Sequence, residues 1–455
     1  MKKFDNIIIG FGKGGKTLAG ALAKAGQTVA MIERSDKMYG GTCINVACIP
    51  TKYLENQAAA SEALGGGFEQ RRERYRKAIE GKRALTAGLR RKNFEKLDVL
   101  DQVQVITGTG SFVDDHHVQV TMADGSTELL EGGRIFINTG SRPFIPPVPG
   151  LADCPLAYTS ESMMELEELP RRLVIIGGGY IGLEFASIFA NFGSQVTIIQ
   201  DGPKFLPRDD QEVAAAVLAS FEERGIRVVT GARITEVKDQ GDSAVIRYEA
   251  DGKTAELVGE AILVATGRRP NLEGLNVEAA GVELTARGEV KTDAGLRTSV
   301  PHIWAMGDVK GGLQFTYISL DDSRIVKSQI LGNGERTTEN RGQVAFSVFV
   351  DPPFSRVGLS EAEAVEKGHK VKVGRLVVGT MPRAKLLGRT TGLMKAVVDA
   401  DTGLVLGAQL FCSESQELIN MIKMAMDAGL PYTVLRDGIY THPTMSEGMN
   451  DLFAI

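Results

Sequence analysis

Two cysteines five positions apart offer the first recognisable chemistry. Cys43 and Cys48 lie in the segment GGTCINVACIPTK, and the chain has only four cysteines. In a regular α-helix, Cα atoms five positions apart are about 8 to 9 Å from each other, beyond the roughly 7 Å that a disulfide spans. Pro50 suits a first helical turn. We therefore predict that a helix begins near Cys48 and that Cys43 loops back toward it.

A cysteine at a helix N-terminus is suited to disulfide exchange, because the helix dipole lowers the pKa of its thiol and stabilises the attacking thiolate. A metal site is the competing interpretation. No nearby histidine or second cysteine pair completes four ligands, so we predict a redox-active pair and no metal. Cys154 and Cys412 have no cysteine or histidine at catalytic spacing and are interpreted as packing residues.

A thiolate that is regenerated in each cycle needs a proton carrier. Among five histidines, His442 has the most suitable surroundings: Pro443 fixes the backbone, and Glu447 can orient the ring and raise its basicity. Taken alone, the motif would fit a structural loop histidine equally well. His442 lies about 400 residues from the cysteines, in a different predicted domain. Its reaching them from a partner subunit would require a homodimer, which we predict.

Two glycine-rich turns indicate two dinucleotide sites. GFGKGG at residues 10–15 follows the apolar residues 6–9, and GGGYIG at residues 177–182 follows residues 172–176. Each turn opens a predicted helix, so its glycines can approach a pyrophosphate that the helix N-terminus also attracts. Glu33 stands where such a unit places its ribose ligand. A chain that binds two nucleotides usually moves electrons between them.

Composition limits the remaining possibilities. The net charge of −5 excludes a nucleic-acid binder that relies on bulk charge, and 455 residues with 43% hydrophobic content predict two to four domains. No window approaches 18 uncharged apolar residues, and the start of the chain does not resemble a cleavable leader. We therefore expect a soluble, cytoplasmic protein that binds neither membrane nor nucleic acid.

The remaining pattern predicts the elements that position these motifs. Residues 69–96 mix arginine with glutamate, which favours solvated helices over an anion site. Asp124-Gly125 marks a hairpin turn. The chain beyond residue 343 suggests an α+β domain. Helices are predicted over 13–25, 183–192 and 416–428, and strands over 28–33, 103–106, 117–121, 195–199, 262–265, 345–350, 376–380 and 394–398.

From end to end, the chain resembles the FAD-dependent pyridine nucleotide-disulfide oxidoreductases. The resemblance implies an α/β fold with two Rossmann-like domains, for FAD and NAD(P), and a C-terminal α+β dimerisation domain. The implied boundaries are 1–150 and 271–340 for FAD, 151–270 for NAD(P) and 341–455 for the interface. The motifs that carry it are Gly10-x-Gly12-x-x-Gly15 with Glu33, GGTC-x4-C ending at Lys52, Thr139-Gly140, GGGYIGLE from Gly177 to Glu184, Ala265-Thr266-Gly267-Arg268, Gly307-Asp308 and His442-Pro443-x-x-x-Glu447.

The resemblance also implies roles for individual residues. Cys48 would be the charge-transfer thiol and Cys43 the interchange thiol that meets substrate. His442, oriented by Glu447, would be the acid/base. Lys52, paired with Glu184, would stand beside the flavin N5. Glu33 would bind the FAD ribose, Asp308 its ribityl chain, and Tyr180 would gate the nicotinamide site. The implied cofactor-binding residues are Gly10, Gly12, Gly15, Glu33, Gly41, Thr42, Lys52, Gly110, Thr139, Gly140, Asp308, Gly177, Gly179, Tyr180, Ile181, Gly182, Gln200, Gly267 and Arg268.

Three stretches indicate which branch of the family the chain resembles: the opening IIIGFGKGGKTLA, the run GLQFTYISLDD at residues 312–322 and the ending NDLFAI. They resemble the reactive-chlorine-resistance branch, whose bacterial members are hypothiocyanite reductases and one of whose members is associated with copper(II) reduction. The chain lacks the C-terminal cysteines of mercuric reductases and large thioredoxin reductases. Dihydrolipoamide dehydrogenase, glutathione reductase-like and metal-reductase activities remain alternatives, as does a flavin-bearing redox sensor or metal-binding protein without efficient turnover.

Two positions depart from the family pattern. Ala47 replaces a glycine before the second cysteine, where a positive φ would cost about 1 kcal/mol. Gln200 stands where an acid normally binds both ribose hydroxyls of NAD. An amide does not repel a 2′-phosphate, and Lys204 and Arg208 follow closely, either as phosphate ligands or as ordinary surface charges. The expected cofactors are therefore FAD with either NADH or NADPH.

Overall fold

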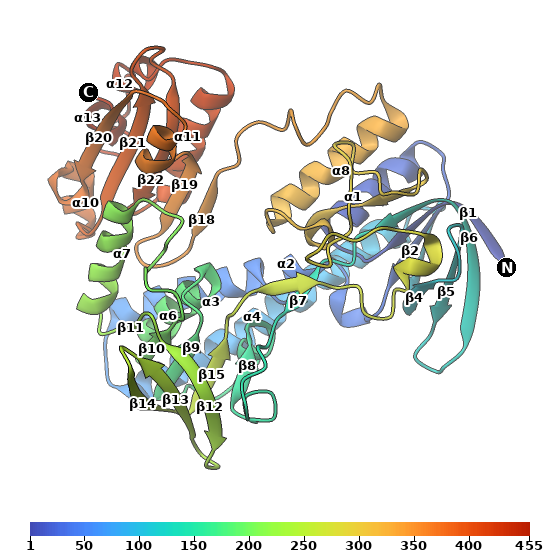
Figure 1. Ribbon diagram of the computed structural model, residues 1–455, viewed down its shortest axis with the longest axis horizontal. Coiled ribbons are helices and arrows are strands. Elements are labelled where there is room, and N and C mark those ends of the chain that lie inside the picture. The colour runs from blue at the N-terminus through green and yellow to red at the C-terminus, as the bar shows by residue number, and fades with distance from the viewer. The chain divides into compact units, whose positions relative to one another are not determined.

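The computed structural model describes all 455 residues, and Figure 1 shows its helices and strands. The chain forms two compact units, each built from three separate stretches. The division proposed from the sequence, at residues 150, 270 and 340, remains a prediction. The first unit comprises Met1–Tyr53, Ile79–Phe144 and Gly267–Arg341, and the second comprises Leu54–Ala78, Ile145–Thr266 and Gly342–Ile455.

The first unit contains a mixed sheet of order β3-β2-β1-β6-β5-β4, with β17 paired to β6. Strands β1, β2, β3, β6 and β17 pair in parallel, whereas β4 and β5 are antiparallel neighbours. A short ribbon of β7 and β16 lies outside this sheet. The strands are β1 (Lys2–Ile9), β2 (Val29–Glu33), β3 (Val103–Thr107), β4 (Thr109–Phe112), β5 (His117–Thr121), β6 (Thr127–Ile137), β7 (Ser141–Pro143), β16 (Arg268–Pro270) and β17 (Ile303–Ala305).

Both faces of this sheet are covered, which explains the continuous apolar run of β1. Ile7 and Ile9 belong to one hydrophobic core, and Ile8 belongs to another on the opposite face. Helices α1 (Lys13–Lys24) and α8 (Thr316–Leu331) pack on the Ile8 side through Leu18, Leu22, Ile325 and Val326. This packing holds the glycine turn after β1 against the helix that follows Asp308.

The cysteine segment forms two helices separated by a short break. Helix α3 (Cys48–Leu64) begins at Cys48, as predicted, and is followed by the long helix α4 (Phe68–Asp98). The expectation that Cys43 lies in a loop was wrong, because Thr42–Asn45 forms the one-turn helix α2. Within this turn the Asn45 side chain donates to the Gly41 carbonyl. Ala47 is not among the non-glycine residues with positive φ, so the strain considered there does not arise.

The second unit contains the other βαβ pattern, in a five-stranded parallel sheet of order β11-β10-β9-β15-β8. The predicted strands at 172–176 and 195–199 are confirmed. Helix α6 (Tyr180–Asn191) begins three residues earlier than expected, directly at the glycine turn. Its other elements are β8 (Ala157–Thr159), α5 (Ser160–Met163), β9 (Arg172–Ile176), β10 (Gln195–Ile199), α7 (Gln211–Glu223), β11 (Arg227–Val229) and β15 (Ala261–Val264).

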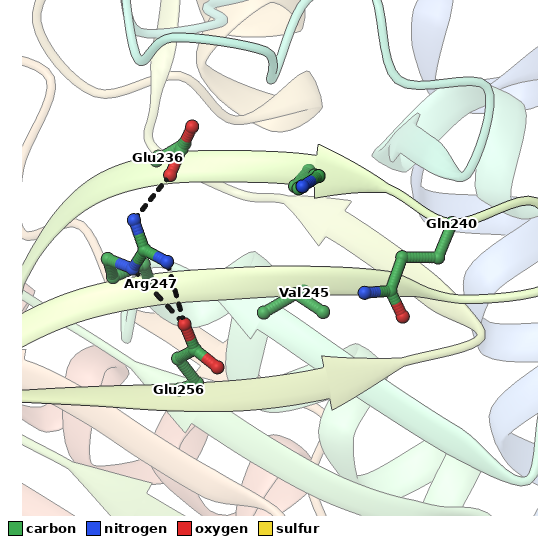
Figure 2. A pocket seen from close by; sticks show the side chains of 6 residues that line it. Glu236, Gln240, Val245, Arg247 and Glu256 are labelled. Carbon is green, nitrogen blue, oxygen red and sulfur yellow. Dashed lines mark hydrogen bonds and ion pairs between the residues drawn. The ribbon is translucent and has the colours of Figure 1, made fainter.

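A separate antiparallel sheet packs against the five-stranded parallel sheet through Val237, Ile246 and Tyr248. Its strands are β12 (Arg233–Asp239), β13 (Ala244–Ala250) and β14 (Lys253–Gly259). Figure 2 shows a polar hollow on this sheet, where Arg247 donates to Glu236 at 2.8 Å and to Glu256 at 3.0 and 3.1 Å. Arg247, Glu236 and Glu256 therefore satisfy one another within the hollow.

The C-terminal part of the second unit is an antiparallel sheet of order β18-β19-β22-β21-β20 covered by short helices, the α+β domain that was predicted. The strand predicted over 376–380 was wrong: β20 ends at Val377, where its partner β21 begins opposite it at Leu393. The elements are β18 (Phe346–Val348), β19 (Phe354–Gly358), α9 (Glu361–Glu366), β20 (Val371–Val377), α10 (Pro382–Leu387), β21 (Leu393–Asp399), β22 (Val405–Phe411), α11 (Ser415–Asp427), α12 (Thr433–Arg436) and α13 (Gly448–Leu452).

None of the helices is both long and apolar enough to cross a lipid bilayer.

Candidate active site

The predicted cysteine pair is brought together by the break between α2 and α3. Cys43 and Cys48 are not joined by a disulfide; both are half-buried, and their side chains are hydrogen-bonded to each other. The break falls at Val46, whose φ of −140° ends the first helical turn. The pair therefore does not share one regular helix, as the five-residue spacing required.

The pKa of Cys43 is lowered to about 6. The hydrogen bond from Cys48 is the largest cause. Burial acts in the opposite direction, and a hydrogen bond to Thr316 and the positive charges of Lys16 and Lys52 lower the pKa further. Cys43 is consequently mostly thiolate at neutral pH, which is the nucleophilic form.

Lys16 belongs to this site although the sequence did not indicate it. Its ammonium donates to the Gly40 carbonyl at 3.2 Å and to the Asn93 amide oxygen at 2.6 Å, which places it beside the cysteine segment. Burial, followed by the charge of Lys13, lowers the pKa of Lys16 to about 8, while the nearby Cys43 opposes the change. Lys16 is therefore still mainly charged at pH 7, where it stabilises the thiolate.

Thr316 was likewise missed, although it lies in the run that marks the branch. It is the first residue of α8 and hydrogen-bonds to Cys43. The next residue, Tyr317, stacks on Phe315 at 5.1 Å, and burial together with the negative charge of Cys48 raises its pKa. The sequence feature that could have indicated Thr316 was the position of this run directly after Gly307-Asp308.

We predict that Thr316→Val shifts the reactivity of Cys43 to higher pH. A hydrogen bond to a charged group contributes about 1.5 kcal/mol or more, and 1.36 kcal/mol corresponds to one pKa unit. The midpoint of the iodoacetamide alkylation rate should therefore rise by about one pH unit, while Thr316→Ser should retain the native midpoint. Peptide mass spectrometry of Cys43 over pH 4 to 9 measures it. An unchanged midpoint in the valine variant would contradict the assignment.

The first glycine turn is tightly packed against its neighbours. Gly10 has a φ of +104°, and a Cβ there would collide with the Asn138 carbonyl. A Cβ on Gly41 would lie 2.6 Å from the Gly12 Cα, so the backbone just before Cys43 approaches the glycine turn directly. Gly15 is buried in α1 beside these residues. The Gly14 N–H donates to the Ser319 hydroxyl of α8 at 3.0 Å.

Glu33 ends β2 in a buried position, and burial raises its pKa. Its carboxylate accepts a hydrogen bond from the Phe11 N–H at 3.0 Å, which holds it beside the glycine turn, where the dinucleotide pattern places the ribose ligand. Gly110, by contrast, lies in β4 against the side chains of Ile9 and Ile32, within the hydrophobic core.

A chain of hydrogen bonds orients Asp308. Arg268 donates to the Ser141 hydroxyl at 2.8 Å and to the Ser141 carbonyl at 2.7 Å, and that hydroxyl donates to Asp308 at 2.7 Å. Burial raises the pKa of Asp308. The hydroxyl of Thr139, next to Gly140 and half-buried Thr42, is buried without a partner. A buried orphan of this kind fits a bound polar group, as the FAD prediction requires.

The second glycine turn presents Gly179 as the N-cap of α6, and no atom lies within 4 Å of a Cβ built there. Tyr180, the next residue, donates to Asp209 at 3.2 Å, and its ring lies 5.3 Å from that of Phe346. Burial, followed by the charge of Asp209, raises the pKa of Tyr180. In the same turn, Gly177 has a φ of +109°, Ile181 is half-buried and Gly182 is buried. Gly267, also predicted to bind a cofactor, is exposed and belongs to the first unit.

Gln200 follows β10, and its amide donates to the carbonyls of Gly202 and Lys204, both at 2.9 Å. The amide oxygen lies against Gly178, on the side of the glycine turn. Lys204 and Arg208 are exposed. Gln200 therefore presents a neutral acceptor to the turn, where a carboxylate would repel a 2′-phosphate.

Gln200→Glu should move the nucleotide preference toward NADH. The new carboxylate would accept from ribose hydroxyls but repel a 2′-phosphate, so we expect the KM for NADPH to rise about tenfold or more and the KM for NADH to change little. Steady-state kinetics with both nucleotides measures the ratio, and Glu212→Gln is a surface control. An equal change in both KM values would contradict a role of Gln200 in selection.

Glu184 and Lys52 lie in different units, so their predicted pairing remains a prediction. Within its own unit, Glu184 accepts a hydrogen bond from the Phe349 N–H at 2.9 Å.

His442 and Glu447, predicted to act as an acid/base pair, have their side chains in hydrogen-bond contact. His442 Nδ1 lies 2.6 Å from Glu447 Oε2. The histidine side chain is 69% exposed, whereas that of Glu447 is 19% exposed and its other oxygen is buried without a partner. With Nδ1 held by the carboxylate, Nε2 is left to carry a proton. His442 belongs to the second unit and the cysteines to the first.

The family models of pyridine nucleotide-disulphide oxidoreductases match residues 4–323, and those of the family's dimerisation domain match residues 344–453. The chain belongs to this family. It is an NAD(P)H-dependent flavoprotein oxidoreductase that uses FAD, and the dimerisation domain indicates a homodimer. The recognition of the family and of its three-part α/β fold is confirmed.

Two relatives and one solved structure show how similar the chain is to other oxidoreductases of the family. It is 46% identical to the probable oxidoreductase RclA of Escherichia coli over the full length of both. It is 33% identical to mercuric reductase of Staphylococcus aureus, over 98% of this chain and 81% of that protein. The Cu(II) complex of the HOCl-induced flavoprotein disulfide reductase RclA from Escherichia coli has a TM-score of 0.94 at 45% identity, covering 100% of this chain and 99% of that one.

Proposed function

We propose that the enzyme passes two electrons from NAD(P)H through FAD to the Cys43–Cys48 pair, and that the resulting dithiol reduces hypothiocyanite to thiocyanate. The observation that carries this proposal is the lowered pKa of Cys43, because a small electrophilic oxidant needs a thiolate at neutral pH rather than a large pocket. The bound nucleotides supply the hydride and flavin chemistry. The chain's own residues carry out the thiol chemistry described next.

The thiolate of Cys43 attacks the sulfur of hypothiocyanous acid, forming a sulfur–sulfur bond as the sulfur–oxygen bond breaks. Hydroxide leaves and takes a proton to become water. The thiolate of Cys48 then attacks the Cys43 sulfur, forms the Cys43–Cys48 disulfide and expels thiocyanate. The two cysteines lose two electrons and the oxidant gains them, so each turnover needs one NAD(P)H to restore the dithiol.

We assign the proton transfers to His442, held by Glu447 at 2.6 Å. The imidazolium would protonate the departing hydroxide, and the neutral ring would receive the proton of Cys48 before that thiol attacks. In this proposal His442 acts across the dimer interface on the cysteines of the partner subunit. Thr316, Lys16 and Lys52 would stabilise the Cys43 thiolate, and the residues of the two glycine turns would hold the nucleotides. A cytoplasmic location is part of the same proposal.

The similarity to RclA supports this substrate class, since that protein is described as HOCl-induced and hypothiocyanite is likewise an oxidant of thiols. The Cu(II) complex of the same protein favours copper(II) reduction as a second candidate function. A copper(II) ion accepts one electron, so two ions would be reduced for each dithiol oxidised.

The test compares oxidation of NADH and NADPH by the FAD-loaded enzyme with hypothiocyanite, glutathione disulfide, lipoamide and copper(II) as separate acceptors. We expect the highest kcat/KM with hypothiocyanite, and one thiocyanate formed for each nicotinamide oxidised. Higher kcat/KM with lipoamide or glutathione disulfide would overturn the substrate assignment while leaving the cofactor route intact. Preference for copper(II) would favour the second candidate.

A further inference from the structure

A second cluster of potential ligands lies in the first unit, outside the residues of the redox pair. Asp115 and His116 belong to the turn between β4 and β5, and His302 directly precedes β17. Each of the three offers one ligand atom, and these atoms all lie within 4.8 Å of one another. Three of the chain's five histidines, counting His117, therefore occupy two short segments beside strand β6.

The backbone of both segments is held by strand β6. The His116 carbonyl accepts a hydrogen bond from the Gly132 N–H at 2.9 Å, and the His302 carbonyl accepts one from the Ile135 N–H at 3.0 Å. Strands β5 and β17 pair with successive stretches of β6, on the side opposite β1. The backbone of the two histidines is thus positioned by a rigid sheet rather than by free loops.

Backbone carbonyls also select the free nitrogen of each ring. His116 Nδ1 lies 2.9 Å from the Gly132 carbonyl, and His302 Nε2 lies 2.9 Å from the Asp115 carbonyl. A carbonyl only accepts, so these nitrogens carry the protons and the other nitrogen of each ring keeps its lone pair. Metal-bound histidines are commonly oriented by such a hydrogen bond. The Asp115 carboxylate is 3.8 Å from His302 Nε2 and its side chain is half exposed.

Asp114 and His117 lie next to the cluster in the sequence but already bind each other. His117 Nδ1 lies 2.8 Å from both oxygens of Asp114, which also accepts the backbone N–H groups of His116 and His117. The first of these backbone bonds is the largest cause that lowers the pKa of Asp114. Asp114 and His117 therefore satisfy each other, which leaves Asp115, His116 and His302 as the ligand set.

We infer that Asp115, His116 and His302 bind one divalent transition metal ion, with Cu²⁺ held more tightly than Zn²⁺. Two imidazoles and one carboxylate suit both ions, and Cu²⁺ stands higher in the general affinity order. The two rings are stacked, with 4.0 Å between their centroids and 3° between their planes, so each lone pair lies in its own ring plane and the two do not point at one shared ion. Binding requires one ring to turn. His116 is the exposed ring and turns toward the ion, giving up its hydrogen bond to the Gly132 carbonyl, while the His302 side chain, 23% exposed, stays in place.

The test uses the FAD-loaded full chain carrying Cys43→Ser and Cys48→Ser, so that the redox thiols do not compete for the metal. Titration calorimetry with Cu²⁺ and with Zn²⁺ should give one site per subunit, tighter for Cu²⁺, and electron paramagnetic resonance should show two nitrogen ligands on Cu²⁺. Adding His302→Ala or His116→Ala should weaken Cu²⁺ binding by about tenfold or more. His117→Ala is the matched control and should change the affinity less than twofold.

Unchanged affinity in both His116→Ala and His302→Ala would overturn the site, as would an equal loss in His117→Ala. Removal of the exposed His116 side chain leaves the core intact, so this variant remains informative if His302→Ala fails to fold. The experiment records binding rather than turnover. Its failure would leave the proposed reaction standing, and failure of that reaction would leave this site standing.

Discussion

Cys43→Ser should lower the rate of hypothiocyanite reduction by on the order of a thousandfold or more. A serine hydroxyl is not ionised at neutral pH and cannot form the sulfur–sulfur bond of the first step. The variant therefore lacks both the nucleophilic sulfur and the lowered pKa that keeps Cys43 ionised. The measurement is kcat/KM for hypothiocyanite in the FAD-loaded enzyme, with nicotinamide at saturation.

Two controls distinguish the loss of the thiol from a general loss of the folded, FAD-loaded enzyme. Reduction of ferricyanide by NAD(P)H should persist, because this acceptor can take electrons before they reach the cysteines. Cys412→Ala is the control for removal of a cysteine, since Cys412 is buried and burial raises its pKa to about 12. We expect this variant to keep the rate within about twofold. Retention of a tenth or more of the activity by Cys43→Ser would contradict the role of Cys43 as nucleophile.

A heterodimer of one Cys43→Ser subunit and one His442→Ala subunit should recover activity that neither homodimer has. Loss of a general acid/base lowers rates by about a hundredfold or more, so both homodimers should be nearly inactive. If His442 serves the partner's cysteines, the heterodimer contains one site with both defects and one intact site. Its activity should then be about half that of the native dimer, given two equivalent sites.

The heterodimer is obtained by co-expression of subunits with two different affinity tags, and its rate is compared with those of the three homodimers. His369→Ala is the matched control, because His369 also contacts a carboxylate, Asp399, at 2.7 Å. A His369→Ala homodimer should stay near the native rate. If His442 acted within its own subunit, each site of the heterodimer would carry one defect, and the activity would stay at the level of the inactive homodimers.

Sequence by itself determined the parts of this protein in which the chemistry is local. The spacing of Cys43 and Cys48 together with Pro50 predicted the start of α3 at Cys48, and the structure has it there. The five-residue spacing of His442 and Glu447 predicted a contact between their side chains, and the structure has a hydrogen bond there. The two βαβ units followed for the same reason, because strand, glycine turn and helix are contiguous and their patterns reflect backbone requirements.

Two element boundaries could not be predicted from the pattern of residue types. Cys43 was expected in a loop, but hydrogen bonding within the turn makes residues 42–45 helical. Strand β20 was expected to reach residue 380, yet it ends at Val377 opposite the first residue of its partner strand. Apolar residues continue past that point because Val378 is buried in the same core, so hydropathy alone could not mark the boundary.

Only the tertiary structure decided which side chains surround the nucleophile. Packing of α1 and α8 on one face of the sheet brings residues hundreds of positions apart together, as the Gly14–Ser319 hydrogen bond shows. The same packing places Lys16 and Thr316 beside Cys43 and thereby lowers its pKa. In the same way, β6 brings His116 and His302 together from two segments. Such contacts depend on how completed elements pack, and no motif of neighbouring residues encodes them.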